Sequence, residues 1–129
     1  MSEGSLWGNL SDIQTIRTPK TILVEQANIL TDATKGVVRA QVEASQTGST
    51  LDYTLVLVAP VLNNYQYTVC RISHGVKVYP YRLFDNTTSG VKPPQQCANE
   101  DELKEKLGAI LSSNTTRNIV QSLLSQSKT

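Results

Sequence analysis

The sequence predicts an α+β fold: an N-terminal helix, a four-stranded antiparallel β-meander and two C-terminal helices packed on the sheet. Three observations predict it. Apolar residues recur at helical spacing before residue 35 and after residue 99, but alternate with polar residues from 38 to 84. Turn-forming residues divide the alternating stretch into four segments. With 129 residues, 39% of them hydrophobic, the chain has the size and composition of one globular domain.

Two parts of the chain differ in composition. Residues 1–17 mix Gly, Ser, Asn and Asp with scattered apolar residues, so we expect a loosely ordered N-terminal arm with Trp7 as its anchor. Residues 18–129 are expected to form a single α+β domain. The first residues lack the basic and apolar regions of a secretory signal, and the longest apolar run is far shorter than the ~20 residues of a membrane span. A cytoplasmic location is therefore expected.

The first helix is predicted over about residues 19–34. Thr18 is a favourable N-cap, and Pro19 suits the first helical position because its missing N–H would have no partner there. Gly36 follows at the place where a left-handed residue commonly ends a helix.

Two further helices are predicted after a long loop over residues 85–98. Asn99 caps the first of them, and acidic residues follow in its first turn, where they favour the positive end of the helix dipole. Ser113 or Asn114 caps the last helix, and the end from Ser125 to Thr129 is expected to fray.

The stretch between these helices contains the four strands. A half-buried strand is predicted from Val38 to Ala44, a second from Leu51 to about Ala59, a third from Tyr65 to Ser73 and a fourth from Val76 to Phe84. The turns between them contain Gly48-Ser49, Asn63-Asn64 and His74-Gly75, residue types that tolerate tight turns.

These turns predict a register. Val42 should lie opposite Leu55 and Ala40 opposite Leu57, whereas the later turns would pair Leu57 with Cys70, and Cys70 with Tyr79. One face of the sheet then gathers the strongest apolar residues, which supports the fold because a one-residue slip would scatter them. The helices are expected to cover this face, whose expected members include Leu55, Leu57, Cys70, Ile72, Tyr79, Tyr81 and Leu83.

The opposite face is predicted to have an apolar centre of four valines with a tyrosine and three arginines around it. This composition is typical of a protein interface. We therefore expect a non-enzymatic protein-interaction module (an adaptor, inhibitor or accessory subunit) whose partner is another protein or a second copy in a two-fold dimer. The alternative that the last helix covers this face stays open. The interaction face comprises Val56, Val58, Val69, Val78, Tyr67, Arg39, Arg71 and Arg82.

A second hypothesis is a nucleic-acid or small anionic ligand site on the third and fourth strands. Aromatic side chains of a sheet can stack on bases while cations contact phosphates. The net charge of +1 gives no general support for a polyanion partner. The residues of this alternative site are Tyr67, Arg71, His74, Lys77 and Arg82.

Enzymatic chemistry is not expected, and a small enzyme that uses Cys70 or His74 is a distant third hypothesis. One His and two Cys cannot supply the three or four ligands of a zinc site, so no metal and no cofactor is predicted. Cys70 should face the core as an unreactive thiol, and Cys97 has no evident base beside it. The order of helix and meander resembles that of many small bacterial α+β proteins, but a shared layout implies no activity.

Overall fold

The computed structural model describes Leu6, Ser11 and residues 18–76, 80–87 and 93–128. In this part of the chain a helix, an antiparallel sheet and two helices follow one another, so the predicted α+β class is confirmed. The predicted arm, residues 1–17, lies outside the described residues except for Leu6 and Ser11, and the division between arm and domain stays a prediction.

In the described part of the chain, five strands form one sheet in the order of the sequence, and each pairs with its neighbours in antiparallel fashion. The fifth strand was not predicted, since its three residues are too few to show an alternating pattern. Part of the expected 85–98 loop is therefore an edge strand. The strands are β1 (Arg39–Thr47), β2 (Thr50–Ala59), β3 (Tyr65–His74), β4 (Tyr81–Asp85) and β5 (Gln95–Cys97).

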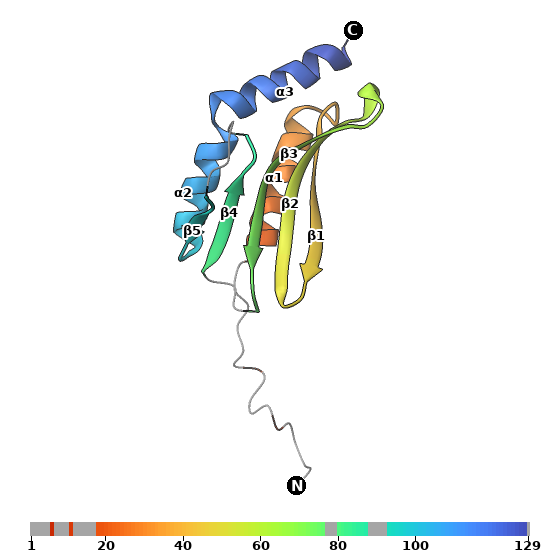
Figure 1. Cartoon of the computed structure of the whole chain (residues 1–129). Coiled ribbons are helices and arrows are strands. Elements are labelled where there is room, and N and C mark those ends of the chain that lie inside the picture. The colour runs from red at the N-terminus through yellow and green to blue at the C-terminus, as the bar shows by residue number, and fades with distance from the viewer. Residues whose placement is uncertain (1–5, 7–10, 12–17, 77–79, 88–92, 129) are drawn as a thin grey trace.

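The three α-helices of the described residues lie on one side and at one end of this sheet (Figure 1). Helix α1 (Pro19–Ala33) begins after the predicted cap, Thr18, whose hydroxyl accepts a hydrogen bond from the backbone N–H of Thr21. Helices α2 (Glu100–Leu111) and α3 (Asn114–Ser127) also start after the predicted caps, although α3 continues into the stretch expected to fray. In Figure 1 the helices leave the other face of the sheet, hereafter the outer face, uncovered.

The first hairpin has the predicted register. Val42 lies opposite Leu55 and Ala40 opposite Leu57. Gly48 in the connecting turn has a φ of 60°, a left-handed conformation that a glycine adopts without strain.

The predicted register of the second hairpin is wrong. A short 3₁₀ turn, η2 (Pro60–Leu62), precedes the two asparagines, so that Leu57 pairs with Tyr67 instead of Cys70. A β-bulge at Val69 then changes the pairing by one residue, and Leu55 lies opposite Cys70. Side chains of a strand alternate between the two faces of the sheet. The extra residue therefore moves the side chains on one side of the bulge to the opposite face.

The predicted third hairpin is also wrong in its pairing. Strand β4 begins at Tyr81, after Pro80, and Cys70 lies opposite Asp85. The observed and predicted registers differ by six residues, an even number, and Leu83 therefore still shares the helix-side face with its partner Ile72. Tyr79 lies outside the described residues.

The hydrophobic core lies between the sheet and the helices, as predicted. Thr31 of α1 ties the first helix to the sheet, since its hydroxyl donates to the Ala27 carbonyl at 2.9 Å and accepts from the Ala40 backbone N–H at 3.1 Å. All three helices contribute to the core. Its buried members include Ile22, Leu23, Ala27, Leu55, Leu57, Val69, Cys70, Ile72, Tyr81, Leu83, Cys97, Leu103, Leu107, Ile110 and Leu123.

Candidate functional site

The outer face contains two of the four predicted valines, but they are not exposed. Val56 is 3% and Val58 5% exposed, although no helix covers this face in Figure 1. Val56 lies between Gln41 and Thr68 on the neighbouring strands, and Val58 lies beside Gln66. Neighbouring side chains of the sheet therefore leave little apolar surface at its centre.

The β-bulge separates the other members of the predicted interaction face. Val69 is buried in the core between sheet and helices, and Tyr67 packs against that core beside Leu57. Both residues therefore lie on the face opposite to Val56 and Val58, and the predicted four-valine patch is wrong in this respect. Val78 lies outside the described residues.

By strand pairing the three arginines belong to the outer face, because Arg39 lies opposite Val58, Arg71 opposite Thr54 and Arg82 opposite Ser73, although the Arg39 side chain extends toward Gly36 at the end of α1. Arg71 binds Asp52 with a distance of 3.2 Å between guanidinium and carboxylate, and it stacks on Phe84 with its central carbon 4.1 Å from the ring centroid. Arg39 and Arg82 are exposed. The outer face is thus a polar surface with one arginine held in place and two that reach into solvent.

The residues of the alternative anionic site are divided between the two faces. His74 is buried on the helix side, where its ring lies 5.7 Å from the Tyr53 ring and 6.2 Å from the Tyr81 ring, measured between centroids. Its Nδ1 donates to the Gly75 carbonyl at 2.6 Å. Tyr67 lies on the same side, whereas Arg71 and Arg82 lie on the outer face, and Lys77 is outside the described residues.

Both thiols are free and buried. Burial in the core raises the pKa of the Cys70 thiol to about 12, with a smaller contribution from the negative charge of Asp85. Burial also raises the pKa of Cys97. Since the thiolate is the reactive form, neither environment favours nucleophilic chemistry.

The described residues contain no cluster of three His, Cys, Asp or Glu side chains that could bind a metal ion. None of the described helices is long and apolar enough to cross a bilayer.

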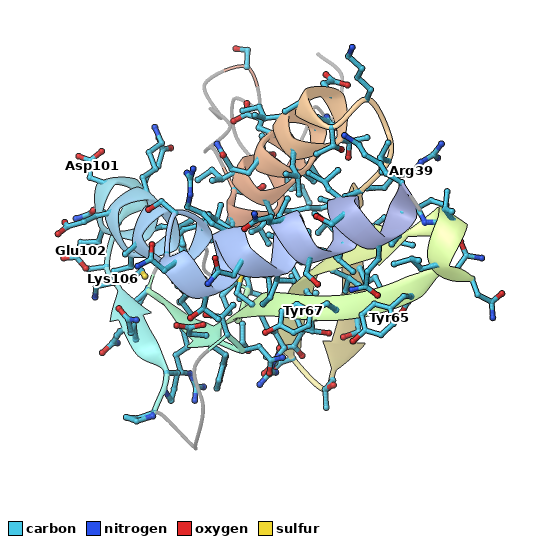
Figure 2. The ribbon with its side chains drawn as sticks, turned by 90° about the horizontal axis from the view of Figure 1, so that it is seen from above. Arg39, Tyr65, Tyr67, Asp101, Glu102 and Lys106 are labelled. Atoms are coloured by element: carbon cyan, nitrogen blue, oxygen red, sulfur yellow. The ribbon has the colours of Figure 1, made fainter. Side chains whose placement is uncertain are left out.

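A different apolar surface lies at the tip of the β2–β3 hairpin. Val61 is 67% exposed and Tyr65 is 55% exposed, and the two flank the turn that joins β2 to β3. Tyr65 lines a hollow of about 340 Å³ between the hairpin and α3, and the lining also includes Leu62, Tyr67 and Ile119. Figure 2 shows Tyr65 and Tyr67 together along β3 near α3. We call this surface the hairpin-tip patch: Val61, Leu62, Tyr65, Tyr67 and Ile119.

The environment of Tyr67 reflects its position at the edge of the core. Partial burial raises the pKa of its hydroxyl, and the electrostatic effects of Asp85 and Tyr65 act in the same direction. Tyr67 therefore keeps its proton and can donate a hydrogen bond. Tyr67 was predicted on an interaction surface, but on the wrong face, and Val61 and Tyr65 were not among the predicted site residues. The apolar residues Val61 and Leu62 next to the Asn63-Asn64 turn were the signal for this patch.

These features define a two-layer α+β protein with a polar outer face and an apolar hairpin tip. Compared with known proteins, the chain matches no family model, and no curated protein or solved structure is significantly similar to it.

Proposed function

We propose that the protein is a non-enzymatic protein-interaction module that uses the hairpin-tip patch, and that two copies associate through it. The observation that supports this proposal is the exposure of Val61 and Tyr65 beside the hollow lined by Tyr67 and α3. Tyrosine is enriched at the centres of protein interfaces because it combines a large apolar ring with a polar hydroxyl.

The position of the patch also suits self-association. A symmetric dimer needs a surface that is complementary to itself, and the patch offers both a projecting part and a recess. Val61 and Tyr65 project from the hairpin, and the hollow between β3 and α3 accepts side chains of about this size. Sheet pairing fixes the backbone of the two tyrosines, since Tyr65 lies opposite Ala59 and Tyr67 opposite Leu57. A tyrosine side chain has only two χ angles, so each loses little conformational entropy on binding.

The outer face has less support as the interaction surface. Its valines are covered, so an interface there would depend on the side chains of Arg39, Arg82 and their polar neighbours. Exposed charges of this kind contribute more to the rate and specificity of binding than to affinity. The nucleic-acid alternative has less support again, because Tyr67 and the arginines lie on opposite faces.

Light scattering coupled to size-exclusion chromatography tests the proposal on the full chain. We expect the wild-type mass to rise toward that of a dimer as concentration increases. Tyr65→Asp should shift the equilibrium to the monomer, because it places a charge in the apolar contact. Val76→Asp is the matched control, since Val76 is 90% exposed and lies away from the patch. A wild-type protein that stays monomeric at every concentration, or a dimer unaffected by Tyr65→Asp, contradicts the proposal.

A further inference from the structure

A second cavity lies on the other side of α3, between α1, α3 and the sheet. It has a volume of about 230 Å³, which exceeds the roughly 150 Å³ of an engineered apolar cavity that binds benzene. Leu55, Leu57 and Val69 line it from the sheet, Leu30 from α1 and Val120 from α3. We call it the inter-helix cavity.

The interior of this cavity offers almost nothing to a polar ligand atom. Thr116 and Gln26 are the polar residues among its described lining. The Thr116 hydroxyl already donates to the Ile110 carbonyl at 2.7 Å and lies 3.1 Å from the Ser113 hydroxyl, so its hydrogen-bonding capacity is largely used. A ligand must therefore insert an apolar group.

Cationic side chains lie in the hollows around the cavity. Two larger and more open hollows, of about 830 and 490 Å³, adjoin it and share lining residues with it. Arg117 lines both hollows, while Lys128 lines the first and Lys104 the second. Lys104 binds Glu100 at 2.8 Å, whereas Arg117 and Lys128 make no ion pair within the described residues. No carboxylate is among the described lining of the cavity or of either hollow.

We propose that the inter-helix cavity binds a single-chain fatty acid, with its hydrocarbon chain in the cavity and its carboxylate at Arg117. An apolar interior with a cationic entrance that lacks competing acids is complementary to an anionic amphiphile. At about 30 Å³ for each heavy atom, the volume of a water molecule in the liquid, the cavity holds roughly eight heavy atoms. This volume fits a medium-length chain whose remaining carbons extend into the adjoining hollow.

Calorimetric titration of the full chain with decanoate below its micelle concentration tests the proposal. We expect binding with a dissociation constant of about 1 mM or lower, an ordinary affinity for a ligand of this size. Arg117→Gln should weaken decanoate binding by roughly threefold to fivefold, the range of a partly exposed charge pair. The same substitution should leave the binding of the neutral 1-decanol unchanged. The matched control is Arg82→Gln, which removes an exposed arginine from the outer face.

A second pair of variants tests whether the hydrocarbon chain of the ligand lies in the inter-helix cavity. Ala33 lines both the cavity and the larger hollow but is itself exposed, so Ala33→Trp should obstruct the site without unfolding the protein. Decanoate binding should then be lost. Ala109→Trp places the same side chain at an exposed position of α2 that lines none of these hollows, and binding should be retained.

Three results would overturn the proposal. The first is the absence of decanoate binding to the wild-type chain, and the second is binding that survives Ala33→Trp. The third is an equal loss of affinity for decanoate and for 1-decanol in Arg117→Gln. Arg117 would then affect the binding of the hydrocarbon chain and not that of the carboxylate. Circular dichroism spectra of the variants separate a lost site from a lost fold.

Discussion

The burial of Val56 on a face that no helix covers leads to a sharp prediction for Val56→Asp. Full burial of a valine side chain contributes about 1.5–3 kcal/mol to stability, and Val56 is only 3% exposed. Its cross-strand neighbours Gln41 and Thr68 carry no positive charge, and nearby Arg71 already binds Asp52. An aspartate there loses the apolar contact and buries an unpaired charge. We expect the free energy of unfolding to fall by at least about 4 kcal/mol.

Urea unfolding followed by far-ultraviolet circular dichroism measures this change. Val56→Thr keeps the shape but buries a hydroxyl, and should cost about 1–2 kcal/mol. Gln41→Asp introduces the same charge at the exposed neighbouring position, and should change stability by no more than about 0.5 kcal/mol. If Val56→Asp were as stable as the wild type to within about 1 kcal/mol, the valine would be accessible to water. The outer face would then again be a candidate apolar interface.

Two further predictions concern the core. The Cys70 thiol has a pKa of about 12 in the folded state against about 9 when unfolded, so the folded state retains the proton between these values. The free energy of unfolding should therefore fall as pH rises from about 9, by up to about 1.4 kcal/mol per pH unit. In urea titrations at pH 7 and pH 10, the free energy of unfolding of Cys70→Ala should fall less between the two pH values than that of the wild type. An identical pH dependence in both proteins would contradict this. Thr31→Val should lower stability by about 1–3 kcal/mol, since it leaves the Ala40 N–H without its acceptor, whereas Thr115→Val at an exposed position of α3 should not. Equal melting temperatures for these two variants would contradict a stabilising role for the hydrogen bonds of Thr31 between α1 and β1.

The β2–β3 hairpin shows why the predicted site was only partly correct. The alternation of apolar residues indicated correctly that Leu57, Cys70 and Ile72 face the helices. It assigned Tyr67 and Val69 to the opposite face because nothing in their sequence marks the bulge between them and the rest of the strand. A bulge depends on the twist of the paired strands and on the packing above them, which are properties of the assembled sheet.

The hairpin-tip patch and the inter-helix cavity illustrate a second limit. Each is formed by residues far apart in the sequence, such as Tyr65 with Ile119, or Leu30 with Val120. The helices and the first four strands were predictable in outline, but not β5 or the path of α3 across the end of the sheet. The hollow at the hairpin tip and the inter-helix cavity lie on the two sides of α3, so both depend on that path.

Local physical chemistry in the sequence determined the helix starts at Thr18, Asn99 and Ser113, the first hairpin and the α+β class, because caps, turns and periodicity act over a few residues. Only the tertiary structure decided which face Tyr67 and Val69 occupy, whether Val56 is exposed, and where hollows remain. Those outcomes depend on the packing of distant segments, in which a single inserted residue reverses the direction of every side chain beyond it.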